Sequence, residues 1–318
     1  MANKKKLPVL YLIIPCYNEE KALPLTCPLF VGKVEELIKA KTVSPDSRVL
    51  FINDGSMDGT WDLIKELSLQ NKLIEGICLS RNRGHQNALL AGLMEAKDRC
   101  DVTISLDCDG QNDINAVDEM MDRYKEGYEI VYGVRKQRDG DAVLKTIFSE
   151  LYYRIMNLLG ANIITNHADY RLVSSRVLNE FKDYQEVHIF LRGLFTLVGF
   201  KSTIVNYDQH PRAAGKTHYD LGRMLRLAVD GITSMSIVPI RLITIFGVIL
   251  SLFNVVMLLV NLFSAGDSRT LHLMFYSICL LFGLLFIALG IVGEYVGKTY
   301  LEAKHRPRYI ISERTYQE

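Results

Sequence analysis

Short apolar runs alternate with longer amphipathic stretches along the first 133 residues. The apolar runs, many of them rich in β-branched residues, predict strands at Val9–Ile14, Arg48–Asn53, Ile74–Leu79, Val102–Leu106 and Glu129–Tyr132. The stretches between them predict helices near Glu20–Ala40, Gly59–Gln70, His85–Lys97 and Asn115–Glu126. Strands that alternate with helices of this length are typical of a doubly wound, mostly parallel α/β sheet.

Two further runs, Leu242–Phe263 and Leu273–Gly293, are almost free of charge. Each has about 20 residues, the length at which a helix crosses roughly 30 Å of hydrocarbon. The alternative is a pair of buried core helices, which rarely run this long without a polar stripe. Because the linker Ser264–Thr270 is short, we expect a two-helix transmembrane hairpin.

Basic residues flank this hairpin on its outer sides, whereas the linker contains only Arg269. The positive-inside rule therefore predicts that the α/β domain and both termini are cytoplasmic. Basic and apolar residues mix at helical spacing just before the hairpin, which predicts a helix at the membrane interface. We expect a cytoplasmic domain at residues 1–218, an interfacial amphipathic helix at 219–240, two transmembrane helices within 241–296 and a cytoplasmic basic tail at 297–318.

The composition excludes some classes of function. The 37 basic and 36 acidic residues nearly cancel, which argues against nucleic-acid binding through bulk charge. No G-x-G-x-x-G follows the first predicted strand, which argues against a dinucleotide oxidoreductase. Gly215-Lys216-Thr217 imitates the end of a phosphate-binding P-loop, but His210 stands where that motif needs glycine. The six cysteines form no Cys-x-x-Cys pair and predict reduced, structural residues.

Polar residues follow the first four predicted strands, at Pro15–Glu19, Asn53–Ser56, Ser80–Asn82 and Asp107–Asp109. In open α/β sheets, ligands bind at the edge where parallel strands end. Asp107 and Asp109 are two residues apart, so both can leave one face of an extended chain. Two carboxylates with Gln111 nearby suit Mg²⁺ or Mn²⁺ that also binds water and phosphate. The alternative is a solvated turn, because Asp-x-Asp is common by chance.

A series of motifs covers nearly the whole chain in one order: IIPCYNEE (13–20), INDGSMDGT (52–60), LSRNRGHQNALLAGL (79–93), DCDGQND (107–113), YGVR (132–135), ADYRLVSSRVL (168–178), PRAAGKTHY (211–219) and GEYVGKTYLEAKHRPRYII (293–311). This series resembles the family 2 glycosyltransferases of GT-A fold, and within them the polyisoprenyl-phosphate glycosyltransferases. These include dolichol-phosphate mannose synthases and bacterial undecaprenyl-phosphate (bactoprenol) glucosyltransferases. The second branch fits best, because its members carry such a hairpin followed by Gly-Glu-Tyr and a basic tail. The resemblance implies a GT-A sheet with a C-terminal two-helix transmembrane hairpin.

The resemblance also implies a donor site at the strand ends. The nucleotide sugar would meet Pro15, Tyr17, Glu19, Asp54, Arg81 and Asp107, and the metal on the diphosphate would meet Asp107, Asp109 and Gln111. A carboxylate such as Asp54 can accept a hydrogen bond from uracil, although the alternative is a turn that caps a helix. The chain departs from the family's usual Leu-Gln-Asp-Pro-Pro after the second Asp, because it has Gly110-Gln111-Asn112-Asp113-Ile114. This keeps the carboxylate pair and puts the metal affinity in doubt.

A lipid phosphate is the acceptor in such enzymes, and it is largely a dianion at pH 7. The cations and hydroxyl that would position it are Arg135, Lys145, Ser149, Arg212 and Lys216. Lys145 and Ser149 share one helix face. Relatives often carry Arg where Lys145 stands. With Lys at this position, the contact to the phosphate would be less bidentate. The alternative for each cation is a solvated surface residue.

Asp169 lies where family members carry an acidic residue beside the reacting sugar, and with Asp109 it is the expected catalytic residue. The resemblance suggests a base or a group that binds a sugar hydroxyl. Because the acceptor is already ionised, we favour positioning and charge stabilisation. The alternative is a buried Asp that pairs with Arg171 or Arg176.

The resemblance implies inverting transfer of a hexose from a nucleotide sugar, with UDP-glucose first, to undecaprenyl phosphate at the membrane. UDP-N-acetylglucosamine is the second donor, followed by UDP-galactose and GDP-mannose, and a homo-oligomer is plausible. A processive polysaccharide synthase is disfavoured, because its Gln-x-x-Arg-Trp motif is missing and the single tryptophan is Trp61. A non-enzymatic membrane scaffold would predict decay of the acidic pair or the phosphate cations, and both are present.

Overall fold

The computed structural model describes residues 6–136, 167–184, 186, 191–210, 240, 242–243, 245–250, 252–253, 256 and 269–316. The chain forms two compact units. The first combines residues 1–153, 162–220 and 307–318, and the second combines 154–161 and 221–306.

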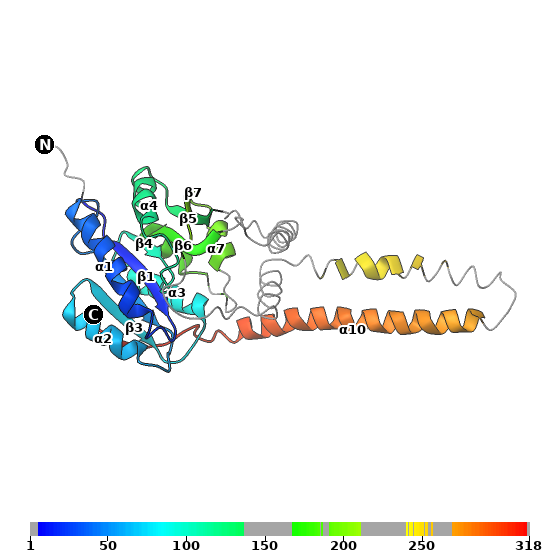
Figure 1. The fold of residues 1–318 in the computed structure, drawn as a ribbon. Helices are drawn as coiled ribbons and strands as arrows, with labels where there is room; N and C mark the ends of the chain where they lie inside the picture. The colour runs from blue at the N-terminus through cyan, green and yellow to red at the C-terminus, as the bar shows by residue number, and fades with distance from the viewer. Residues whose placement is uncertain are drawn as a thin grey trace. The chain divides into compact units, whose positions relative to one another are not determined.

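An eight-stranded mixed sheet forms the first unit within the described residues (Figure 1). Its strands are β1 (Leu10–Cys16), β2 (Arg48–Asn53), β3 (Ile74–Leu79), β4 (Val102–Ser105), β5 (Ile130–Arg135), β6 (His167–Ser174), β7 (Ser202–Tyr207) and β8 (Ile311–Arg314). The spatial order is β7-β5-β6-β4-β1-β2-β3-β8. Strand β6 runs antiparallel to β4 and β5, and β8 runs antiparallel to β3. The remaining pairs are parallel, which confirms the mostly parallel sheet predicted from the sequence.

The central strands are mostly apolar and buried because both faces of the sheet are covered. All seven residues of β1 are buried, and alternate side chains enter two different cores. One core lies against α1 (Leu23–Lys39), α2 (Thr60–Gln70) and α4 (Ala116–Lys125). The other lies against α3 (His85–Ala96), α6 (Ser175–Phe181) and α7 (Leu191–Leu197). Each fully buried Leu or Ile contributes about 1.5–3 kcal/mol.

The strand β8 was not expected from the sequence. It lies in the segment predicted as a basic tail, and its residues Ile311–Arg314 alternate poorly between apolar and polar. It pairs with β3, with Ile77 opposite Arg314 and Cys78 opposite Glu313. The strand covers the edge of β3, whose backbone groups would otherwise lack partners.

A single helix, α10 (Arg269–Ala303), accounts for most of the described part of the second unit. Its part Leu280–Ala303 has 24 residues, includes an 18-residue window with a mean hydropathy of 2.1, and is long and apolar enough to cross a membrane. Among the described residues no other helix meets these criteria. The large side chains of Leu280, Phe282 and Phe286 are exposed, as lipid-facing side chains would be. The first apolar run is described only in part, so the hairpin stays a prediction.

Candidate active site

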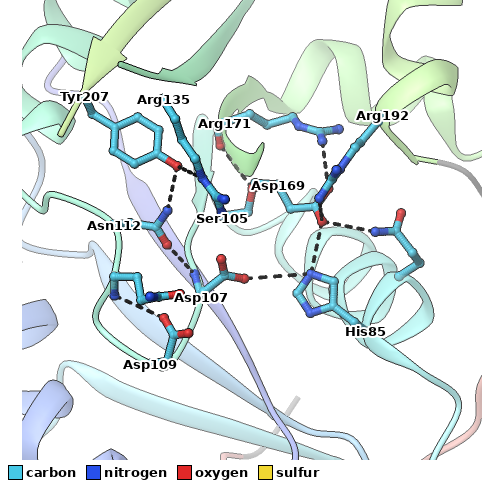
Figure 2. A network of polar contacts seen from close by, with 12 residues as sticks. His85, Ser105, Asp107, Asp109, Asn112, Arg135, Asp169, Arg171, Arg192 and Tyr207 are labelled. Carbon is cyan, nitrogen blue, oxygen red and sulfur yellow. Dashed lines mark hydrogen bonds and ion pairs between the residues drawn. The ribbon is translucent and has the colours of Figure 1, made fainter. Parts of the chain in front are cut away.

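The ends of the parallel strands and the beginning of β6 meet at one edge of the sheet. Since β6 runs antiparallel to β4, its first residues lie beside the last residues of β4. Ser105 at the end of β4 donates its hydroxyl to the carbonyl oxygen of Asp169 (Figure 2). The topology therefore brings Asp107 and Asp169 together although they are distant in sequence.

The loop after β4 carries the two carboxylates predicted to hold a metal. Cys108 lies in the core between them, whereas Asp107 and Asp109 remain partly exposed. The Oδ1 of Asp109 accepts the backbone N–H of Gln111 at 3.0 Å, and Gly110 turns the chain with a φ of 70°. That φ is rare for residues with a side chain, so a glycine fits here.

The carboxylate of Asp169 is buried and accepts hydrogen bonds from several side chains. Arg192 contacts both of its oxygens, from Nε at 3.2 Å and Nη2 at 3.1 Å. Arg171 donates from Nη2 at 3.2 Å, and Gln86 donates from Nε2 at 3.2 Å. Burial alone would raise the pKa of Asp169, but Arg192, His85 and Arg171 outweigh it and hold the pKa well below its ordinary value.

His85 lies between the two acidic groups, as Figure 2 shows. Its Nε2 is 3.3 Å from Oδ2 of Asp169 and 4.0 Å from Oδ1 of Asp107. The side chain of His85 is 42% exposed, and although its partial loss of water would lower the pKa, the two carboxylates outweigh this effect and raise the pKa. His85 therefore connects the loop after β4 to the Asp169 cluster.

A second chain of polar contacts connects Arg135 to the loop after β4. The hydroxyl of Tyr207 accepts from Nε of Arg135 at 3.1 Å and from Nδ2 of Asn112 at 3.2 Å (Figure 2). The Oδ1 of Asn112 accepts the backbone N–H of Asp107 at 3.0 Å. The predicted acceptor-phosphate residue Arg135 is therefore fixed relative to the predicted metal carboxylates.

Asp54, predicted to contact the nucleotide base, is buried at the end of β2. Its carboxylate accepts the backbone N–H groups of Arg83 at 2.7 Å and Gly84 at 2.9 Å. Burial raises the pKa of Asp54, and these two bonds offset part of that rise. Asp54 therefore holds the loop that carries Arg81, and a contact to the base stays a prediction.

The remaining donor-site predictions fall near the same edge. Pro15 is buried in β1, and Tyr17 just beyond it is 43% exposed. The backbone N–H of Glu19 donates to Oγ1 of Thr60 at 2.9 Å, and Arg81 is exposed. Lys145, Ser149, Arg212, Lys216 and almost all of the predicted interfacial helix lie outside the described residues.

No group of three or more His, Cys, Asp or Glu side chains that could hold a metal occurs in the described part of the chain. A metal at Asp107 and Asp109 would therefore need oxygen ligands from an amide, water or substrate phosphate.

The sequence did not predict roles for His85, Arg192 or Tyr207. His85 lies inside the quoted motif LSRNRGHQNALLAGL, next to the residues that were chosen, and that was the available signal. Arg192 and Tyr207 follow apolar stretches and resemble ordinary surface or core residues. Their contacts appear only once β6 and β7 are in place.

The comparisons with known proteins agree with this architecture. The sequence model described as "Glycosyl transferase family 2" matches residues 11–181. The chain is 43% identical to the glycosyltransferase YkoT of Bacillus subtilis, over 99% of this chain and 94% of that protein. It is 33% identical to the prophage bactoprenol glucosyl transferase homolog of Escherichia coli, over 94% and 97%, and 32% identical to the bactoprenol glucosyl transferase of Shigella phage SfV, over 94% and 97%.

Among solved structures, the chain resembles glucosyl-3-phosphoglycerate synthase from Mycobacterium tuberculosis in complex with Mn²⁺, UDP-glucose and phosphoglyceric acid. The TM-score is 0.47 at 15% identity, over 72% of this chain and 79% of that one. The family match and the near-full-length relatives are far stronger evidence of the family than this structural likeness. The chain belongs to glycosyl transferase family 2, with a GT-A-like mixed sheet, and is a glycosyltransferase.

Proposed function

We propose that the protein transfers a hexose from a nucleotide sugar, with UDP-glucose as the first donor, to undecaprenyl phosphate with inversion at the anomeric carbon. The observation that carries the proposal is that Asp107 and Asp169 lie at the same edge of the sheet, with His85 between them. Relatives named bactoprenol glucosyl transferase match nearly the whole chain, which supports a polyprenyl phosphate as the acceptor.

The donor half of the site would lie on the loops after β1 to β4. Asp107, Asp109 and Gln111 fit Mg²⁺ or Mn²⁺, because carboxylate and amide oxygens are the ligands that these ions prefer and Asp107 is 31% exposed. Bound there, the metal would neutralise charge on the diphosphate as it leaves. Pro15, Tyr17, Glu19, Asp54 and Arg81 would surround the nucleotide.

The acceptor half of the site would lie on the other side of the loop after β4. Arg135, whose Nε is held by Tyr207, would present the rest of its guanidinium to the lipid phosphate, together with Lys145, Ser149, Arg212 and Lys216. The attacking phosphate oxygen forms a bond to the anomeric carbon while the bond from that carbon to the diphosphate breaks. Since the acceptor is already ionised, the step needs no proton transfer to the protein.

Asp169 would act by position and charge. Its carboxylate accepts from four side chains and its pKa is lowered, so it is a poor proton acceptor at neutral pH. It would hold Arg192 and His85 in place beside the reacting sugar. We further propose that α10 belongs to a transmembrane hairpin and that the sheet domain and both termini are cytoplasmic, which would bring the site to the lipid phosphate.

The test is transfer of radiolabel into organic-extractable lipid. The full-length protein in detergent is mixed with undecaprenyl phosphate, Mg²⁺ or Mn²⁺, and a panel of labelled nucleotide sugars. We expect labelled lipid with at least one UDP-sugar and none after chelation with EDTA. The control is an Asp208→Ala variant, changed at an exposed residue that pairs with Lys136, and it is expected to transfer sugar as the unchanged protein does. If no donor in the panel yields labelled lipid, the proposal is wrong.

A further inference from the structure

The residues that follow α10 are built into the catalytic sheet beside a loop of the proposed donor site. The carbonyl oxygen of Ile310 accepts the backbone N–H of Ser80 at 2.9 Å. At the other end of the pairing, the backbone N–H of Thr315 donates to the carbonyl oxygen of Gly76 at 3.0 Å. Between them, Oγ of Ser312 donates to the carbonyl oxygen of Cys78 at 3.1 Å. These bonds attach the C-terminal segment, residues 309–316, to the chain from Gly76 in β3 to Ser80 just after it.

Side chains anchor the far end of the C-terminal segment to α3. Arg314 contacts both carboxylate oxygens of Glu95, at 2.7 and 3.2 Å, and the Tyr316 hydroxyl donates to Glu95 at 2.9 Å. The guanidinium of Arg99 lies 4.1 Å from the centre of the Tyr316 ring. The carboxylate of Glu95 is only 15% exposed, so this bidentate pair is partly shielded from water. The segment is therefore held by specific contacts over its whole length.

The loop next to this segment is the one that carries Arg81 and leads into His85. On its inner side, the Asp54 carboxylate accepts the N–H groups of Arg83 and Gly84. Gly55 packs against the same loop so closely that an added Cβ would lie 2.4 Å from the carbonyl carbon of Arg81. On its outer side, the loop begins at Ser80, which is bonded to Ile310. The loop is thus hydrogen-bonded to the end of β2 on one side and to the C-terminal segment on the other.

We propose that the C-terminal segment is a positioning element of the nucleotide-sugar pocket. By holding Ser80 it fixes the backbone that presents Arg81, so less conformational entropy is lost when the donor binds. The inference rests on the proposed function, which assigns this loop to the nucleotide sugar. Only residues 304–310 separate α10 from β8, so the chain that leaves the apolar helix is also the chain that supports the donor loop.

The test is a charge exchange at the Arg314–Glu95 anchor, which lies away from the donor loop. The full-length protein in detergent is titrated with UDP and Mg²⁺ by calorimetry, and the KM values for the nucleotide sugar and the lipid phosphate are measured. Arg314→Glu places two carboxylates together and is expected to raise the Kd for UDP about fivefold. The exchanged pair Arg314→Glu with Glu95→Arg is expected to recover most of that loss.

The matched control is Arg123→Glu, which reverses a charge on α4 in an exposed pair with Glu119 and Glu126. It is expected to leave the Kd for UDP within twofold of the unchanged protein. A positioning role raises the KM for the sugar donor and leaves the KM for the lipid phosphate unchanged. If Arg314→Glu binds UDP normally, or if both KM values rise equally, the inference is wrong. If the unchanged protein binds no UDP and transfers no sugar, the proposed function is wrong and the inference falls with it.

Discussion

Replacing Asp169 with Asn tests how the buried charges of the site depend on one another. The substitution keeps the shape of the side chain but removes its charge. Arg171 is 1% exposed and its guanidinium contacts Asp169 at 3.2 Å. Its other described contacts are the carbonyl oxygen of Leu191 at 3.2 Å and the ring of Phe195 at 4.6 Å, neither of which carries a charge. Asp169→Asn therefore leaves a buried cation without its carboxylate.

The expected loss follows from this burial. Removing one partner of a buried ion pair costs about 3–5 kcal/mol, because the remaining charge is buried and uncompensated. The amide oxygen of Asn can still accept one of the bonds now made by Arg171 and Arg192, so we take the lower end. Asp169→Asn should lower the free energy of unfolding of the sheet domain by about 3 kcal/mol. This corresponds to roughly a hundredfold change in the folding equilibrium.

The fluorescence of Trp61 offers a direct assay, since it is the only tryptophan of the chain. Its indole N–H donates to Glu313 at 2.9 Å, so its environment changes when the sheet domain unfolds. Urea titration of the full-length protein in detergent gives the free energy of unfolding for each variant. The control is Asp208→Asn, where the carboxylate is 66% exposed and pairs with Lys136 at 3.1 Å. An exposed pair of this kind contributes about 0–1 kcal/mol.

The outcome that would refute this reasoning is equal stability of the two variants. If Asp169→Asn loses less than about 1 kcal/mol, as expected for the surface control, Arg171 does not depend on that carboxylate. A loss of stability without any loss of sugar transfer would show instead that Asp169 is structural and has no part in the reaction.

Three further outcomes are expected. Asp109→Ala should reduce sugar transfer at least about 100-fold in a radiolabel assay, since metal coordination is worth several kcal/mol; unchanged turnover would exclude Asp109 as a ligand. Gly55→Ala should cost about 1–3 kcal/mol in urea titration and raise the KM for the donor, because Gly55 has a φ of 62° and no room for a Cβ beside Arg81. The pKa of Asp169 is lowered in the folded state, so its contribution to stability is complete above about pH 4 and is lost as the pH falls toward the lowered pKa. Asp169→Asn should remove that acid-side slope, and an unaltered slope would contradict the assignment.

The sequence predicted the parallel core of the fold well. Strands β1 to β4 are buried on both faces, so they appear as continuous apolar runs with clear ends. Strands β6, β7 and β8 were not predicted. β6 contains Asp169 and Arg171, which are buried and charged because they pair with each other and because Arg192 and His85 also contact Asp169. β8 is a short polar edge strand, and a pattern search finds no signal in such a strand.

The candidate site was predictable only where one strand end carries the chemistry. Asp107 and Asp109 follow a single strand, so local alternation predicted that they share one face, while the metal role came from the resemblance and stays a prediction. Tyr207 contacts Asn112 across 95 positions and Arg135 across 72, distances that a single sequence does not reveal. For Asp54, the alternative of a turn that caps a helix named only local partners, whereas its carboxylate binds the backbone N–H groups of Arg83 and Gly84, 29 and 30 positions away.

The antiparallel pairing of β4 with β6 has a consequence for exchanging parts between relatives. The residues proposed to bind the donor lie before residue 114, apart from the C-terminal segment proposed to support their loop, and those proposed for the acceptor begin at Arg135, the last residue of β5. The two stretches meet where Thr103 Oγ1 donates to the carbonyl oxygen of Val173 at 3.0 Å and Ser105 Oγ to that of Arg171 at 3.3 Å. A chimeric enzyme joined between residues 114 and 129 would take the proposed nucleotide and metal residues from one parent, and the proposed acceptor-phosphate residues together with Asp169 and Arg192 from the other. The side chains that bond between the two stretches would need to come from the same parent, among them Asn112 with Tyr207, Gln86 with Asp169 and Glu95 with Arg314.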